Sequence, residues 1–127
     1  MDRADVDLFE KLVAQLNGFY QELSILVKKS QNDAVNLFKL KFINGVLRQC
    51  NDLLGENYRP FPDFEVFSSD DLPSNSDVTF IISQYIECAE KFRADNIKQA
   101  GIWWIWDLDE DDDDDKIRTA PPKKLGR

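Results

Sequence analysis

The feature that most constrains this chain is a stretch in which an apolar segment runs directly into an acidic one. Residues 102–106 read Ile-Trp-Trp-Ile-Trp and contain every tryptophan of the chain, whereas residues 107–115 hold eight acids in nine positions. Burial of indole rings is favourable, while carboxylates must stay solvated or pair with cations. We therefore expect this stretch to lie at a boundary between the core and the solvent.

Three segments before this stretch have the apolar spacing of amphipathic helices. Each repeats apolar residues at intervals of three and four positions, and a short polar break separates the first segment from the second. So short a connection places two helices side by side in opposite directions. The second segment is apolar on several sides, with Phe38 and Phe42 on its main face, which is typical of a central helix. The sequence predicts an all-α fold, a three-helix antiparallel bundle with helices at about 5–29, 34–54 and 75–99.

A few residues mark where these helices begin and end. Ser74 with Asp77 three positions later is a weak capping box at the start of the third helix, and Gly55 is a natural C-cap for the second. The outer face of the third helix is mixed in charge sign, which indicates a solvated surface. Its charged residues are Glu87, Glu90, Lys91, Arg93, Asp95 and Lys98.

The connection between the second and third helices, at 56–73, is rich in aromatic residues and proline. Its rings are Tyr58, Phe61, Phe64 and Phe67, and the prolines among them disfavour helix. Exposing this many rings to water is unfavourable, so we expect the loop to lie across the helices with its rings turned inward. We call it the aromatic strap, and we favour packing over ligand binding as its role.

The chain after the third helix favours extended structure. The run at 102–106 has strong β preference, and 116–120 is a second short β-compatible piece. The two pieces are able to pair as a ribbon, which would bring Lys116 and Arg118 near the acids. Because the helices and the strap offer a core, we expect at least two of the three tryptophans to be largely buried.

The domain organisation follows from the same patterns. Residues 1–106 are predicted to form a single helical domain that ends with the extended segment 102–106. Residues 107–127 are the acidic run followed by a basic, proline-containing tail, and we expect this part to be mobile.

The residue types of common catalytic sites are missing. The chain has no histidine, its five glycines stand alone instead of forming a phosphate-binding loop, and Cys50 and Cys88 have no CxxC spacing. The carboxylate pairs Glu87–Glu90 and Asp70–Asp71 lack the histidine that a ferritin-like centre requires. We therefore expect no enzyme activity, no catalytic residue and no cofactor.

The acid run does not have the pattern of a calcium site. Asp107, Asp109 and Asp111 occupy the first, third and fifth places of an EF-hand loop, but the sixth place is Asp112 and the twelfth is Arg118. The loop needs glycine at the sixth place and glutamate at the twelfth. We expect no specific metal site.

Charge and hydropathy limit the partners. The net charge is −8, so the chain lacks the cations that displace phosphate counterions, and we expect no nucleic-acid partner. No apolar run approaches the ~20 residues that span a bilayer, and no signal-peptide pattern is present, so we expect no membrane contact and a cytoplasmic location. A protein with a basic surface is the partner that this charge favours.

These observations favour a non-catalytic, acidic protein-interaction module, such as an inhibitor or immunity protein that covers a basic surface of its partner. Aromatic rings are strong interface anchors, and an acid run speeds encounter with a basic partner. The alternative is a structural or assembly subunit of a larger complex, or a homodimeric helical scaffold joined through a spare apolar helix face. The predicted partner-binding residues are Trp103, Trp104, Trp106, Asp107, Asp109, Glu110, Asp111, Asp112, Asp113, Asp114 and Asp115.

Overall fold

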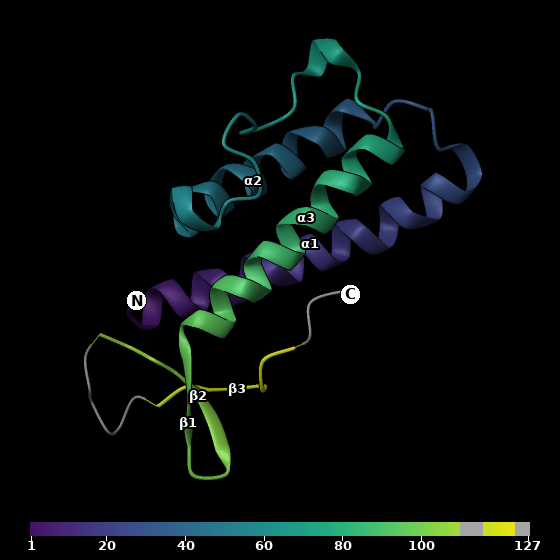
Figure 1. Cartoon of the computed structure of the whole chain (residues 1–127). Helices are drawn as coiled ribbons and strands as arrows, with labels where there is room; N and C mark the ends of the chain where they lie inside the picture. The colour runs from purple at the N-terminus through teal and green to yellow at the C-terminus, as the bar shows by residue number, and fades with distance from the viewer. Residues whose placement is uncertain (110–115, 124–127) are drawn as a thin grey trace.

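A computed structural model describes residues 1–109 and 116–123 of the chain. These residues form three long helices followed by three short strands (Figure 1). The prediction of a mainly helical fold with three helices is confirmed, and a small sheet is added at its C-terminal end. The elements are α1 (Arg3–Ser30), α2 (Leu37–Tyr58), the 3-10 helix η1 (Ser69–Asp71), α3 (Asn75–Asp95), β1 (Ile97–Ala100), β2 (Trp103–Trp106) and β3 (Arg118–Thr119).

Side-chain caps set the starts of α1 and α3. The Asp2 carboxylate accepts from the backbone N–H of Asp5 at 2.9 Å, and the Asp5 carboxylate accepts from the N–H of Asp2 at 3.1 Å. At α3, the Ser74 hydroxyl accepts from the N–H of Asp77 at 3.1 Å, and the Asp77 carboxylate accepts in return at 3.4 Å. Each pair satisfies two backbone donors that a helix start leaves open. The capping box predicted at Ser74 is confirmed.

The second helix begins and ends later than the predicted 34–54. At its start, Ala34 forms a β-bridge with Ser74, and the Asn36 carboxamide oxygen then accepts from the first backbone N–H groups of α2. At its end, Gly55 has φ 68°, the left-handed region that a C-cap glycine favours. The chain nevertheless continues for one more helical turn, to Tyr58.

The prediction that the third helix runs to about residue 99 is wrong, because α3 ends at Asp95 and the next residues form β1. A tight hairpin takes its place. Gly101 and Ile102 are the two residues between Ala100 and its partner Trp103. Gly101 has φ 63°, and glycine at the first central position is the mark of a type II′ hairpin turn. Pairing with the Trp-rich strand outweighs the helical preference of residues 97–99.

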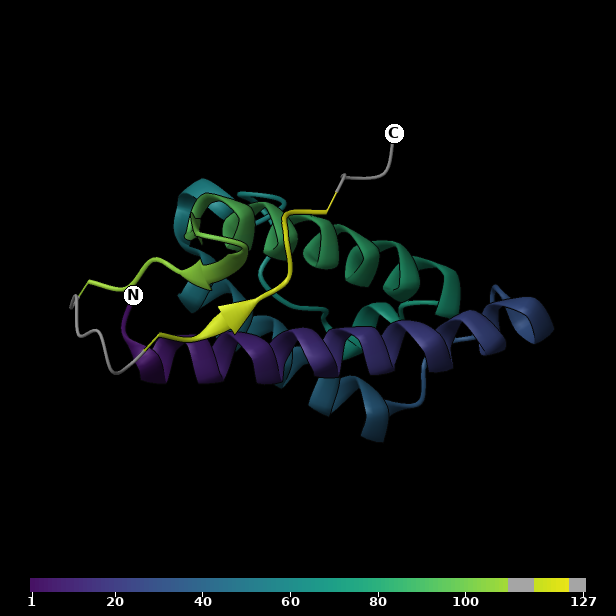
Figure 2. The same ribbon diagram turned by 90° about the horizontal axis from the view of Figure 1, so that it is seen from below.

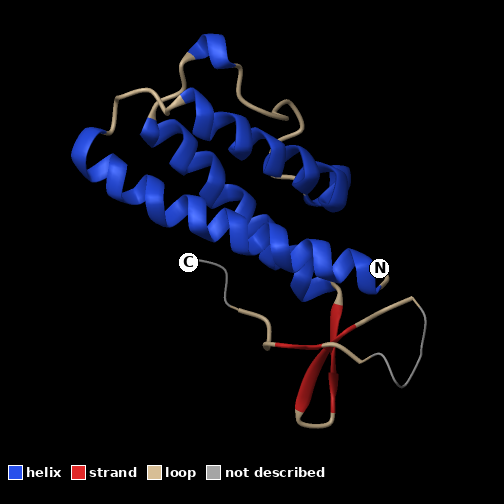
Figure 3. Cartoon of the chain, turned by 180° about the vertical axis from the view of Figure 1, so that it is seen from behind, coloured by secondary structure: helices blue, strands red, loops and turns tan. Residues whose placement is uncertain are grey.

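The three strands form an antiparallel sheet with β2 in the centre. β2 pairs with β3 through Trp104↔Thr119 and Ile105↔Arg118, which confirms the ribbon that the sequence allowed between 102–106 and 116–120. Figures 1 and 3 show the sheet projecting from the end of the helical body at which the N-terminus lies. Sequence reasoning did not anticipate β1 as the third strand.

The core lies among the three helices and continues under the sheet. Buried side chains of α1, α2 and α3 form one apolar cluster, which also contains Ile97 and Trp106 from the sheet. Phe9 of α1 lies at the sheet end of this cluster, 5.5 Å from the ring of Phe92 and 5.2 Å from Trp106 between ring centroids. Seen from below in Figure 2, α1 runs along the length of the body beside α3.

The aromatic strap packs on the helices, as predicted. The ring of Tyr58 meets that of Phe92 edge-on at 5.2 Å, and Phe64 meets Phe67 at 5.0 Å. Tyr58, Phe64 and Phe67 are partly buried against the core cluster. The Asn44 side chain ties the strap to α2, because its amide donates to the carbonyl of Phe67 at 2.9 Å and accepts from the N–H of Phe67 at 3.0 Å.

Candidate protein-interaction surfaces

The three tryptophans of β2 differ in exposure. Trp106 is 2% exposed and belongs to the core, Trp104 is half-buried against the core, and Trp103 is 49% exposed. The expectation of at least two largely buried tryptophans is therefore met fully by Trp106 and in part by Trp104. The indole N–H of Trp106 is buried without a hydrogen-bond partner among the described residues. Of the three predicted anchors, Trp103 is the one with a ring open to a partner.

The described acids after β2 are tied to other parts of the chain. Asp107 lies 3.3 Å from the ammonium of Lys98, and the Asp109 carboxylate lies 2.7 Å from the N-terminal ammonium of Met1. The hydrogen bond that this ammonium donates to the Asp109 carboxylate raises the pKa of the ammonium. The other predicted acids lie outside the described residues; they are Glu110, Asp111, Asp112, Asp113, Asp114 and Asp115. The predicted mobility of 107–127 stays a prediction, although 107–109 and 116–123 have defined contacts.

The tip of the β1–β2 hairpin carries exposed apolar surface. Ile102 is 84% exposed and Trp103 follows it in the chain; we call these two residues the hairpin tip. The guanidinium of Arg118 lies 3.9 Å from the centroid of the Trp103 ring, a cation–π contact. The expected nearness of Arg118 to the acids stays a prediction, because residues 110–115 lie outside the described residues. The cation–π contact orients Trp103 while leaving about half of its surface open.

The C-terminal segment is held to α3 by Arg93, which the sequence placed wrongly on a solvated face. Arg93 is 7% exposed. Its Nη2 and Nε donate to the two carboxylate oxygens of Glu90 at 2.6 and 2.8 Å. Its remaining N–H groups donate to the hydroxyl of Thr119 and to the carbonyls of Ala120 and Pro121, at 2.7 to 2.9 Å. We call this arrangement the Arg93 clasp.

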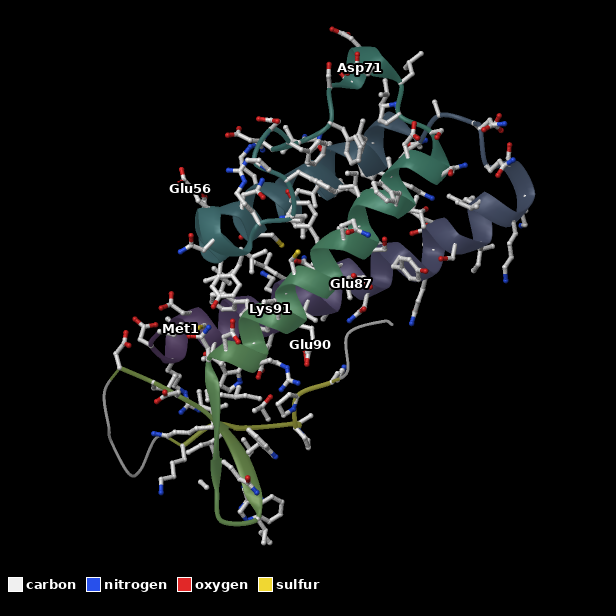
Figure 4. The ribbon with its side chains drawn as sticks, in the orientation of Figure 1. Met1, Glu56, Asp71, Glu87, Glu90 and Lys91 are labelled. Atoms are coloured by element: carbon white, nitrogen blue, oxygen red, sulfur yellow. The ribbon has the colours of Figure 1, made fainter. Side chains whose placement is uncertain are left out.

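Glu90 completes the clasp from the same helix. Figure 4 shows Glu90 on the side of α3 that faces the C-terminal segment. Burial by itself raises the pKa of this carboxyl, but the hydrogen bonds from Arg93 and from the backbone N–H of Lys123 outweigh burial and lower the pKa. Because all five guanidinium N–H groups of Arg93 have partners within the chain, the clasp has no donor left for a ligand. The role of the clasp is to hold the C-terminal segment against α3.

Burial favours the protonated form of both thiols. Burial raises the pKa of Cys50 to about 12, and burial also raises the pKa of Cys88. The thiolate is the nucleophilic form of cysteine, so both side chains are poor nucleophiles near neutral pH. Within 1–109 and 116–123, no three cysteine, aspartate or glutamate side chains gather as a metal-binding group.

A second exposed apolar surface lies between α1 and α2. Phe38 is 72% exposed and Phe42 is 52% exposed, and their ring centroids are 5.0 Å apart at 71°. Beside them is a hollow of about 240 Å³. We call this surface the apolar groove; it is lined by Phe19, Leu23, Phe38, Phe42 and Ile43, with Glu22 and Lys39 on its rim.

Sequence analysis missed this surface because it assigned Phe38 and Phe42 to the main buried face of the second helix. The residues of α2 that are buried are Leu40, Ile43, Val46, Leu47, Cys50 and Leu54. Phe38 and Phe42 lie on the other side of the cylinder, four residues apart and in edge-on contact with each other. An apolar pattern all round a helix indicated burial on all sides, whereas one side of α2 is open.

None of the described helices is long and apolar enough to cross a membrane. Comparisons of this chain with protein-family models, with curated proteins and with solved structures found no match.

Proposed function

We propose that this chain is a non-catalytic, acidic protein-interaction module that binds a basic protein through the hairpin tip. Its most specific form is an inhibitor or immunity protein that covers a basic site on its partner. The observation that carries the proposal is the exposure of Trp103 and Ile102, at 49% and 84%, on a hairpin that projects from the body (Figure 3).

The hairpin tip has the properties of an interface anchor. Trp103 is held in place by Arg118 and by its pairing with Ala100, so little side-chain freedom is lost when a partner covers the ring. Tryptophan is among the residues most enriched at the energetic centres of interfaces. Trp106 and Trp104 act differently, because they fix the hairpin to the core.

The acid run supplies the charge. It begins directly after β2, so a partner seated on the hairpin tip would be within reach of the field of residues 107–115. Charges of this kind raise the association rate and make it depend on salt, with less effect on the lifetime of the complex. We therefore expect Trp103 to contribute most of the affinity and residues 107–115 to raise the association rate.

The test uses the full-length chain. Truncation after Trp106 would also remove β3 and the carbonyls that Arg93 binds, so substitutions separate the effects better. Full-length protein captures its partner from source lysate, and the recovered protein is titrated against Trp103→Ala and against a variant with Asp111–Asp115 replaced by serine. Phe80→Ala is the matched control, because it removes an exposed ring near the start of α3, and the hairpin follows the other end of that helix.

Trp103→Ala should weaken binding at least tenfold, mainly by faster dissociation. The serine variant should associate more slowly and lose most of its salt dependence. A partner that binds both variants as tightly and as quickly as the unsubstituted chain, at low and high salt, would remove the hairpin and the acid run from the site.

A further inference from the structure

The first turn of α2 carries an aromatic ring where a helix favours an acid. Asn36 caps α2, so Phe38 is the second residue of the helix. The helix dipole stabilises negative side chains in this turn, yet the turn contains none. Instead Phe38 stands 72% exposed beside Phe42. Within the described residues Phe38 gains an edge-on contact with Phe42, but most of its surface stays uncovered, so we expect a further contact from outside the chain.

Both helices that line the apolar groove contain a glycine, which also suggests a contact from outside the chain. Gly18 lies within α1 directly before Phe19, and Gly45 lies within α2 three residues after Phe42. Glycine inside a helix lowers its stability relative to alanine. A Cβ added at either position would meet no described atom within 4 Å. Neither glycine is required by packing within the chain, and both leave room for the close approach of another backbone.

The rim of the groove carries one charge of each sign. Glu22 of α1 and Lys39 of α2 form an ion pair, and their side chains are 56% and 43% exposed. A surface with a projecting pair of rings, a hollow beside them and one acid with one base at the rim can be complementary to itself. A two-fold axis would set Phe38 of each copy into the hollow of the other. The same axis would bring Lys39 of each copy to Glu22 of the other.

We propose that the apolar groove is the interface of a homodimer, with a second copy of this chain as its occupant. The two rings leave roughly 250 Å² uncovered in each copy, taking ring surfaces of about 150–250 Å². Two copies would bury roughly 500 Å² of ring surface together with the groove walls, which is below the roughly 1,000 Å² of a stable interface, so we expect a weak, transient dimer. The inference is independent of the proposed function, because the hairpin tip lies at the sheet end of the molecule (Figure 1).

The test is sedimentation velocity of the full chain over a wide range of concentrations. The unsubstituted chain should shift from monomer to dimer, and Phe38→Asp should stay monomeric, with its dissociation constant raised at least a hundredfold. Ile102→Asp is the matched control: it makes the same kind of change at an exposed apolar residue of the hairpin tip and should leave the dimer intact. Circular dichroism confirms that each variant keeps its helices.

Salt gives a second readout with a definite sign. Each copy carries a net charge of −8, and this long-range repulsion should outweigh the two exposed and therefore weak Lys39–Glu22 contacts, so screening should tighten the dimer. Binding of a basic partner at the hairpin should weaken under the same change. An unsubstituted chain that is monomeric at every concentration, or a dimer that persists in Phe38→Asp, would overturn the proposal.

Discussion

At the sheet end of the molecule the ring of Phe9 lies under Trp106, whereas between α1 and α2 the rings of Phe38 and Phe42 face outward. The chain closes the first region with its own C-terminal strands. It then ties those strands down with the Arg93 clasp, in which every N–H of the guanidinium has a partner. The second region has the Glu22–Lys39 ion pair at its rim, and each of the two helices that line it contains a glycine at which an added Cβ would meet no described atom.

The difference teaches how to tell internal from external surface in this chain. At the sheet end the apolar side chains lie near a buried guanidinium whose N–H groups all have partners, although the indole N–H of Trp106 has none among the described residues. Where apolar side chains are left open, the local residues are poor choices for the isolated helix, as Phe38 and Gly45 are in α2. Substitutions at the sheet end should therefore lower stability, while substitutions at the groove should raise it and impair association.

The largest effect is expected at the sheet end. Trp106→Ala removes a ring that is 2% exposed and in contact with Phe9, and it should lower the free energy of unfolding by about 3–5 kcal/mol. Trp103→Ala is the matched change on the same strand and should cost only about 1 kcal/mol, from a half-exposed ring and its cation–π contact. Urea unfolding measures both. Equal losses would contradict the division between core and surface tryptophans.

The second-largest loss of stability is expected at the Arg93 clasp. Arg93→Met leaves the Glu90 carboxylate partly buried without its guanidinium, and we expect a loss of about 2–4 kcal/mol, because Glu90 can regain some water. Adding Glu90→Gln to Arg93→Met should recover part of the loss, since no unpaired charge then remains. In a double-mutant cycle by urea unfolding, a coupling near zero would mean that the two side chains act independently.

Lowering the pH should reduce the contribution of Glu90 to the free energy of unfolding. The pKa of Glu90 is lowered in the folded state, so its contribution to stability is complete above the unfolded pKa of about 4.3 and is lost as the pH falls through the folded pKa. The difference in unfolding free energy between the unsubstituted chain and Glu90→Gln should be constant from neutral pH to about pH 5 and should narrow below about pH 4. A difference that widened toward acid would reverse the sign of this linkage.

At the groove, Gly45→Ala should raise the free energy of unfolding of the monomer by about 1 kcal/mol, because alanine favours helix and its Cβ meets no described atom. The same Cβ should weaken the dimer. Thermal unfolding at low protein concentration and sedimentation at high concentration separate the two effects. A variant that is more stable and dimerises as well as before would place Gly45 outside the interface.

The smallest effect on folding is expected from Phe38→Asp. The ring is 72% exposed, and an acid in the first turn of α2 gains about 0.3–1 kcal/mol from the helix dipole, so stability should change little or rise slightly. Urea unfolding of dilute protein measures this change. A loss above about 2 kcal/mol would show that Phe38 belongs to the core of the monomer.

The helices, the capping box at Ser74 and the aromatic strap follow from local patterns, so the sequence was sufficient to predict them. The hairpin was missed because residues 97–99 alone suit a helix, and their strand depends on a partner strand and on the turn at Gly101. The burial of Arg93 was missed because, apart from Glu90, its partners lie 26 to 28 residues away in the chain. The open face of α2 was missed because periodicity shows that a residue is apolar but not which segment covers it.

The most direct test of the groove as a dimer interface is a mixing experiment with two charge variants, Glu22→Lys and Lys39→Glu, measured by native mass spectrometry. In an isologous dimer, the first variant gathers four bases at the interface, two from each copy, and the second gathers four acids, so each alone should dimerise poorly. The account predicts that the mixture forms the heterodimer in preference to either homodimer. A random distribution of dimers, or monomers throughout, would contradict it.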